Sequence, residues 1–292
     1  MLKHRLLSGT LMALAFIGVV IFDGWLDGSW TASVADDKQV RGTLVCILII
    51  LVVVVAQFEL SKLAAAKNLK VFKPVSILGS ILLASTWYWP QLVEISAQLY
   101  LSFVLAFVLM ALLLSQYIRC GTENLLANCG ANCFCIIYVG LLSGFALAIT
   151  IDFGVWSLLM VVFVVKFSDI GAYAIGRPFG KHKFSPKISP GKTWEGMAAA
   201  VVTAIMAAFA FAVGFDIMGK RIMVWWLAII FGCCFAFIAL AGDLIESMIK
   251  RDAQQKDSAK NVPGFGGILD VIDSPLVAAP FGYLFFMLFT RV

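Results

Sequence analysis

The residues best suited to chemistry in this sequence are acidic, and they gather near its C-terminal end. Six of the 17 carboxylates fall between residues 243 and 273. A helix over 243–250 would place four polar side chains on one face, those of Asp243, Glu246, Ser247 and Lys250. Asp270 and Asp273 share a helix face by the same rule. The Pro-Gly-Phe-Gly-Gly stretch at 263–267 is too rich in glycine to stay helical, so the chain folds back there and can bring the two faces together.

Carboxylates that meet at a water-accessible membrane edge would suit Mg²⁺. This ion takes one or two carboxylates and fills its other positions with water and substrate phosphates. Asp243, Asp270 and Asp273 are the candidate ligands, because they adjoin apolar helix, where an unassigned charge costs about 3 kcal/mol.

A second interpretation applies to the other charges of this segment. For Glu246, Asp252 and Lys260 we favour a solvated loop whose charges pair internally. Pairs of Asp252 or Asp257 with Lys256 or Lys260 are the examples that the spacing allows.

A second polar segment, residues 168–196, is basic and is predicted to be broken into turns by its prolines and glycines. Its cations are Arg177, Lys181, Lys183, Lys187 and Lys192. Together with hydroxyls and free N–H groups, such cations suit phosphate. Thr193 precedes a helix expected to begin near Glu195, whose N-terminus favours an anion. We interpret His182 as one more phosphate donor; the alternative for the whole segment is a patch that sets topology and binds lipid headgroups.

The rest of the chain is apolar enough to hold these segments in a membrane. It is 62% hydrophobic and 13% charged, whereas soluble chains carry about 25% charged residues. Spans of about 20 apolar residues form helices in lipid, where the backbone finds no water. Nine candidates are present, at 6–24, 42–61, 74–90, 94–116, 131–150, 153–168, 195–215, 222–242 and 269–290. We predict an all-α, polytopic integral membrane protein with about nine transmembrane helices.

The first of these segments is expected to be a retained helix and not a cleaved signal peptide, because its apolar run ends far from the small residues 33–35. The organisation we expect is N-terminal transmembrane helices over 1–130 and a catalytic transmembrane region over 131–292, with polar loops 169–196 and 243–273. Seven cysteines, an odd number mostly in or near apolar segments, argue against a disulfide framework.

Basic residues predict the orientation. The segments 62–73, 177–192 and 243–267 fall on one side if nine helices alternate, together with Lys3 and Arg5. The loops on the opposite side carry few cations, except for the segment 216–221, which carries Lys220 and Arg221. The positive-inside rule places the polar site and the N-terminus in the cytoplasm and the C-terminus opposite. We therefore interpret the net charge of +5 as topology plus affinity for anionic lipid, and not as nucleic-acid binding.

The two polar segments together resemble the signature of phosphatidate cytidylyltransferases, also called CDP-diacylglycerol synthases. One match is Ser247-x2-Lys250-Arg251-x4-Lys256-Asp257-Ser258, then Pro263-Gly264-x-Gly266-Gly267-Ile268-Leu269-Asp270-x2-Asp273-Ser274. The other is Asp169-x2-Ala172-Tyr173-x2-Gly176-Arg177-x2-Gly180-Lys181-His182-Lys183, then Ser189-Pro190-x-Lys192-Thr193-x-Glu195-Gly196. The matches cover roughly residues 166–280. The sequence departs from the family pattern at Phe265, where His is usual, and at Val271, where Arg is usual.

The resemblance implies transfer of a cytidylyl group from CTP to phosphatidate, giving CDP-diacylglycerol and pyrophosphate for phospholipid biosynthesis in the inner (plasma) membrane. It implies that Asp243 and Asp270 hold Mg²⁺ with support from Asp273, and it leaves open a second, monovalent cation such as K⁺. Ser247 would be a ligand or a hydrogen-bond donor beside the metal. It also suggests a homodimer.

The other motif residues receive roles from the resemblance as well. Three cations of the catalytic set, Lys250, Arg251 and Lys256, would bind the triphosphate or the lipid headgroup. One further carboxylate, Asp257, completes the set. The nucleotide-binding set is Asp169, Tyr173, Arg177, Lys181, His182, Lys183, Ser189, Lys192 and Thr193. Two other functions stay open: an ion-coupled secondary transporter, which also places carboxylates in the membrane, and a cytidylyltransferase or kinase that acts on a prenyl lipid.

Overall fold

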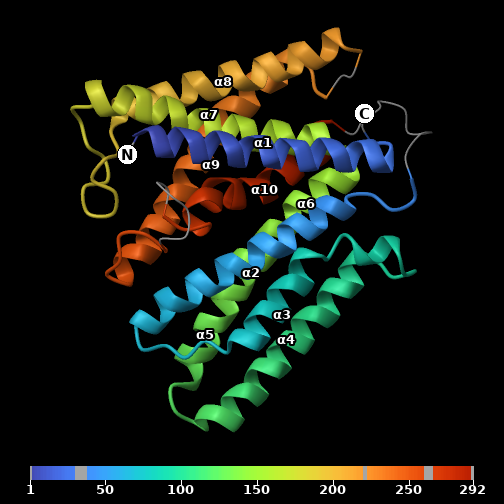
Figure 1. Ribbon diagram of the computed structural model, residues 1–292, viewed down its shortest axis with the longest axis vertical. Helices are drawn as coiled ribbons and strands as arrows, with labels where there is room; N and C mark the ends of the chain where they lie inside the picture. Colours follow the sequence, from blue (N-terminus) through green and yellow to red (C-terminus); the bar gives the residue numbers. More distant parts are fainter. Residues whose placement is uncertain (1, 30–37, 220–221, 260–265, 291–292) are drawn as a thin grey trace.

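The computed structural model describes residues 2–29, 38–219, 222–259 and 266–290, and this part of the chain is mostly helical and has no named strand (Figure 1). The helices are α1 (Leu2–Asp27), α2 (Thr43–Ala66), α3 (Lys73–Ala84), α4 (Ala97–Cys120), α5 (Leu125–Cys135), α6 (Leu142–Phe153), α7 (Val155–Phe179), α8 (Trp194–Ile217), α9 (Trp225–Asp252) and α10 (Leu269–Phe289). A short 3₁₀ turn, η2 (Trp89–Gln91), precedes α4, and a π-helix, η3 (Ile136–Leu141), joins α5 to α6. The predicted all-α class is confirmed.

Eight stretches of the described chain are long and apolar enough to cross a membrane, and α5, η3 and α6 together make one of them, Leu125–Phe153. The ninth predicted segment, 74–90, holds only the 12-residue α3. Twelve helical residues span about 18 Å, against about 30 Å of hydrocarbon. The helix ends where the hydroxyls of Ser85 and Thr86 donate to the carbonyls of Ile81 and Leu83, and the turns that follow lead to α4.

The basic polar segment is more helical than predicted. The expectation that the chain breaks into turns from residue 168 is wrong for 168–179, because α7 runs to Phe179. Glycines here serve close helix packing: a Cβ on Gly176 would lie 3.2 Å from the Cα of Gly196 in α8. The irregular part is therefore short, residues 180–193. Likewise, residues 243–252 continue α9.

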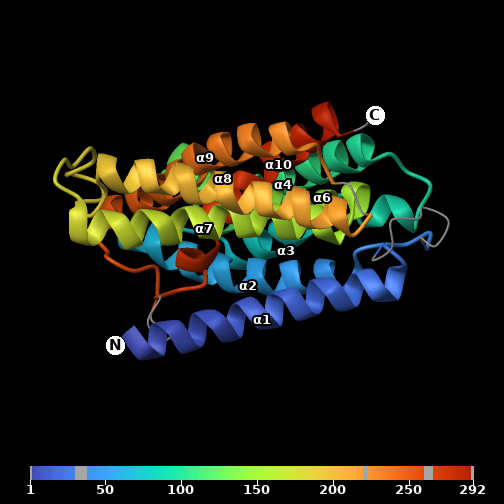
Figure 2. The ribbon, with the colours of Figure 1, turned by 90° about the horizontal axis from the view of Figure 1, so that it is seen from above.

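The three basic segments gather at one end of the molecule. The Nζ of Lys67 lies 3.0 Å from Asp252, and the Nε of Arg251 donates to the carbonyl of Ile188 at 3.3 Å. The predicted shared side is thus confirmed, and Asp252 pairs with Lys67 instead of with Lys256; its predicted pairing with Lys260 stays a prediction. Lys260 and residues 220–221 lie outside the described residues. The start of α1 lies at this same end and the end of α10 at the other (Figures 1 and 2).

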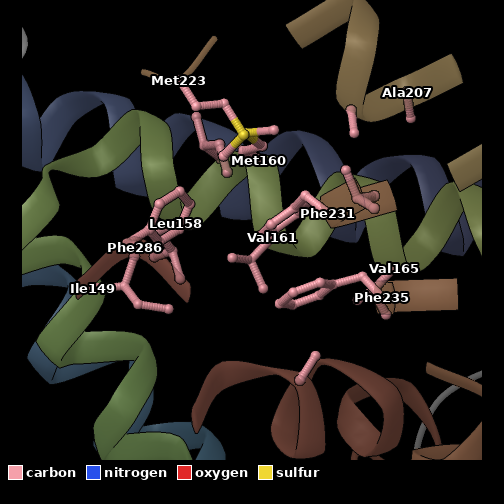
Figure 3. Packing of buried hydrophobic residues seen from close by; sticks show 14 of the residues in the cluster. Ile149, Leu158, Met160, Val161, Val165, Ala207, Met223, Phe231, Phe235 and Phe286 are labelled. Carbon is pink, nitrogen blue, oxygen red and sulfur yellow. The ribbon is translucent and has the colours of Figure 1, made fainter. Parts of the chain in front are cut away.

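An apolar core joins the helices that carry the polar end. Phe231 and Phe235 of α9 stack with ring centroids 3.9 Å apart, and they pack with Val161 of α7 and Phe286 of α10 (Figure 3). This core fixes α9 against α7 and α10, so the polar residues that follow on these helices are held by a rigid base. The division of the chain at residue 130 stays a prediction.

Gly232 is expected to be essential for the packing of α9 on α8. A Cβ at this position would lie 2.5 Å from the Cα of Ile205 and 2.8 Å from the carbonyl oxygen of Ala204. Gly232→Ala should lower the melting temperature in detergent, since overpacking costs about 1–3 kcal/mol and outweighs a gain in helix propensity of about 1 kcal/mol. Gly130→Ala in α5 is the control, because nothing lies within 4 Å of its Cβ. Equal melting temperatures for the two variants would contradict the expectation.

Candidate functional site

Three carboxylates converge where α9 meets α10. One oxygen from each of Asp243, Glu246 and Asp273 lies within 4.8 Å of the other two. Glu246 is 1% exposed and Asp273 is 5% exposed. The helices can approach because position 242 is glycine: a Cβ there would lie 2.8 Å from the Cα of Ser274. The predicted meeting of the two acidic faces is confirmed.

Glu246 corrects the sequence-based interpretation. We favoured a solvated loop for this residue, and that is wrong: it is buried in α9 and forms an ion pair with Lys250. The interpretation failed because the helix continues to Asp252, which places Glu246 one turn after Asp243 on the buried face.

Asp270 lies beside this cluster, across Lys250 from Glu246. The Nζ of Lys250 is 2.6 Å from the Oδ1 of Asp270. The other oxygen, Oδ2, accepts from the backbone N–H of Gly267 at 2.7 Å and from the hydroxyl of Ser258 at 2.7 Å. Lys250 therefore joins the acidic faces of the two helices. The assignment of Asp243, Asp270 and Asp273 as metal ligands stays a prediction.

A second cation reaches the cluster from the basic segment. The Nζ of Lys192 lies 2.5 Å from the Oδ2 of Asp243. The next residue, Thr193, is the N-cap of α8, and its hydroxyl accepts from the N–H of Gly196 at 3.2 Å. On α7, Asp169 pairs with Lys166 at 3.5 Å. The two predicted polar segments thus form one site, with cations beside the carboxylates.

His182 pairs with an acidic residue of α8. Its Nδ1 lies 2.6 Å from the Oε1 of Glu195, and the backbone N–H groups of Lys181 and His182 donate to the same carboxylate. Glu195 thereby ties the loop 180–193 to the first turn of α8. The role of His182 as a phosphate donor stays a prediction.

The remaining predicted residues are not members of the carboxylate cluster. Ser189 and Ser247 are half-buried. The others have exposed side chains, namely Tyr173, Arg177, Lys181, His182, Lys183, Arg251, Lys256 and Asp257. Arg177 donates to the hydroxyl of Tyr173. Phe265, one of the two departures from the family pattern, lies outside the described residues.

The carboxylate cluster fits a divalent cation. It offers hard oxygen donors, which Mg²⁺ prefers. The Oε1 of Glu246 is buried and has no hydrogen-bond partner among the described residues. A buried, unsatisfied carboxylate oxygen is costly, and coordination to a metal would remove that cost.

A sequence model described as "Cytidylyltransferase family" matches residues 38–289. The chain belongs to the cytidylyltransferase family. Proteins named phosphatidate cytidylyltransferase are similar to it: one from Haemophilus influenzae is 44% identical over 137 residues, 46% of each chain. One from Mycobacterium bovis is 37% identical over 158 residues, 53% of this chain and 50% of its own. One from Bacillus subtilis is 29% identical over 291 residues, 99% of each. The match thus spans about half the length of the first two and nearly all of the third.

Three residues at this end of the molecule received no role from the sequence. Glu59 of α2 binds the start of α10, Lys166 pairs with Asp169, and Glu195 holds His182. A signal was present for the first two, since each is a lone charge inside an apolar run, and charges within membrane segments are usually functional or paired. Glu195 carried the weaker signal of an acid in the first turn of a helix.

Proposed function

We propose that the protein transfers the cytidylyl group of CTP to phosphatidate, giving CDP-diacylglycerol and pyrophosphate, on the cytoplasmic side of the inner (plasma) membrane. The observation that carries the proposal is the cluster of the partly buried Asp243 with the buried Glu246 and Asp273, next to Lys192 and Lys250. Such a site can hold a metal and a triphosphate together. The names of the similar proteins support the substrates.

The reaction requires positioning and charge neutralisation more than a strong base. A phosphate oxygen of phosphatidate, already ionised near pH 7, attacks the α-phosphorus of CTP. The new P–O bond forms as the bond to the β-phosphate oxygen breaks, and pyrophosphate leaves with that electron pair. Lys192, which contacts the cluster, and the exposed cations of the basic segment, Arg177, Lys181 and Lys183, bind and orient the triphosphate.

Asp243, Glu246 and Asp273 are the residues proposed to hold Mg²⁺, and Asp270, assigned from the sequence, completes the acidic edge through Lys250. When bound, the ion supplies Lewis-acid polarisation of the α-phosphate and neutralises the leaving pyrophosphate. A monovalent cation such as K⁺ is proposed to accompany it. Ser247 is half-buried and follows Glu246 in α9, and it is proposed to donate a hydrogen bond beside the Mg²⁺ site.

The location of the cluster supports the enzyme over a secondary transporter. Asp243 and Glu246 lie in the last ten residues of the 28-residue α9, and Asp273 lies near the start of α10. Transporters place such groups near the bilayer midplane, whereas an edge position lets CTP arrive from water and acyl chains from the bilayer. The end of the molecule at which the basic segments gather is proposed to bind anionic lipid and not nucleic acid. The family resemblance supports a homodimer.

The test is an assay of purified protein in liposomes with phosphatidate, Mg²⁺ and labelled CTP, scored for CDP-lipid and pyrophosphate. Wild type should form both products, and either EDTA or Asp270→Asn should abolish them. A prenyl phosphate is offered in parallel. If wild type uses only the prenyl lipid, the acyl substrate is wrong; if it uses neither lipid, the proposed function is wrong.

A further inference from the structure

Glu59 is a fully buried carboxylate that lies outside the two polar segments. It belongs to α2, it is 0% exposed, and its carboxylate binds groups at or beside the start of α10. Its Oε1 accepts from the N–H of Ile268 at 3.0 Å, and its Oε2 accepts from the N–H of Leu269 at 2.9 Å. The hydroxyl of Ser258 lies 3.0 Å from Oε2. A charge buried this deeply requires such partners.

The first turn of α10 depends on this remote carboxylate. A helix begins with backbone N–H groups that have no partner within the helix, and the N-cap residue of α10, Ile268, has no side chain that can accept from them. Glu59 binds the N–H groups of Ile268 and Leu269, and Asp270 binds that of Gly267. Negative charge at this end also interacts favourably with the helix dipole.

The contact between Glu59 and α10 is tight and also reaches Asp270. A Cβ on Gly267 would lie 2.0 Å from the Oγ of Ser258 and 2.2 Å from the Oε2 of Glu59, so only glycine fits there. The Oγ of Ser258 lies 3.0 Å from Glu59 and 2.7 Å from the Oδ2 of Asp270. A hydroxyl has a single proton, so the two carboxylates share one donor and their positions are coupled.

We infer that Glu59 is a positioning residue that fixes where α10 begins and how its first turn is rotated. Asp270 lies in that turn and Asp273 follows it, so their directions toward Lys250 and toward the cluster depend on the turn staying wound. Each residue of an α-helix turns the side-chain direction by about 100°. A start displaced by one residue would therefore turn both carboxylates away from α9. The consequence for catalysis rests on the proposed function.

The test compares Glu59→Gln with Asp23→Asn by hydrogen exchange of the purified full chain. Asp23 is the matched control: it is 1% exposed and accepts from the N–H of Leu44 at 2.7 Å, at the start of α2 and therefore at the other end of that helix. In Glu59→Gln, peptides that cover 266–273 should exchange about tenfold faster, since a bond to a charged acceptor is lost. In Asp23→Asn these peptides should exchange as in wild type.

The metal provides a second readout. Binding of Mn²⁺, followed by electron paramagnetic resonance without any substrate, should weaken about tenfold in Glu59→Gln and stay unchanged in Asp23→Asn. In the cytidylyl-transfer assay, the Mg²⁺ concentration for half-maximal rate should rise in parallel. If Glu59→Gln exchanges at the same rate as wild type and binds Mn²⁺ with the same affinity, the inference is overturned. If wild type shows no transfer at all, the proposed function fails, but exchange and Mn²⁺ binding still decide the role of Glu59.

A second variant covers the case in which Glu59→Gln does not fold. Glu59→Asp keeps the charge but is one methylene shorter, so it cannot reach Ile268, Leu269 and Ser258 together. Hydrogen exchange of peptides that cover 266–273 should therefore be faster in Glu59→Asp than in wild type. Wild-type exchange in Glu59→Asp would then overturn the inference.

Discussion

Replacing Asp273 by asparagine is expected to lower the rate of CDP-lipid formation about 10³-fold while the protein stays folded. The change removes one of the three carboxylates that converge with Asp243 and Glu246, and with it a charge that the proposed ion needs. Asparagine has the same shape, and its side-chain oxygen can still accept from the N–H of Ser274, as the Oδ1 of Asp273 does at 2.6 Å. The measurement is the initial rate with labelled CTP, together with the melting temperature.

Asp152→Asn is the matched control for this variant. Asp152 ends α6 on the side away from the site and binds the hydroxyl of Tyr283 in α10 at 2.7 Å. The same substitution therefore touches the same helix at its other half. We expect a rate within about twofold of wild type, since a single exposed hydrogen bond contributes about 1 kcal/mol to folding and none to the reaction. Equal rates for Asp273→Asn and Asp152→Asn would contradict the assigned role of Asp273.

The second large effect is expected at Lys250. Its side chain is 13% exposed and lies between Glu246 and Asp270, whose side chains are 1% and 9% exposed. Lys250→Met keeps the length of the side chain but leaves two nearby carboxylates without their shared cation. Removing one partner of a buried ion pair costs about 3–5 kcal/mol. We expect a fall in melting temperature of roughly 10 °C in detergent, and loss of cytidylyl transfer.

Lys67→Met provides the comparison, because it breaks an ion pair of the same type at the surface. The side chains of Lys67 and Asp252 are 44% and 70% exposed, and such pairs contribute about 0–1 kcal/mol. Its melting temperature should stay within a few degrees of wild type. If Lys250→Met melts as Lys67→Met does, the Lys250 bridge does not stabilise the fold.

Much of the architecture was predictable because membrane spans carry a strong signal in each segment by itself. The apolar runs identified the helices, and the basic segments identified the end at which they meet. The length of α7 was not predictable in this way, since Gly171 and Gly176 looked like helix breakers. In the fold they face α8, where Gly171 approaches Thr203. A glycine that breaks a helix and one that admits a neighbouring helix look the same in one sequence.

In the site, too, residues with informative local spacing were predictable, and residues that depend on distant contacts were not. Asp243, Lys250, Asp270 and Asp273 were identified because their spacing within one segment is informative. Glu246 was misjudged, since its burial depends on how far α9 extends. Glu59 was missed because its partners are about 200 residues away, and local spacing carries no information on such a contact. Lys192 next to Asp243 required the two polar segments to meet, which was expected only from the family resemblance.

The long connection between Glu59 and α10 sets the order in which the protein can mature. Glu59 and Ile268 are separated by 209 positions, so a ribosome that adds about 5–20 residues per second needs roughly 10–40 s to deliver the partner. Through that interval α2 carries a carboxylate whose backbone donors on α10 do not yet exist. The acidic centre can then form only when α10 docks, because Asp270 and Asp273 lie on that helix. Newly made chains therefore acquire the proposed metal site only after α10 has joined α9.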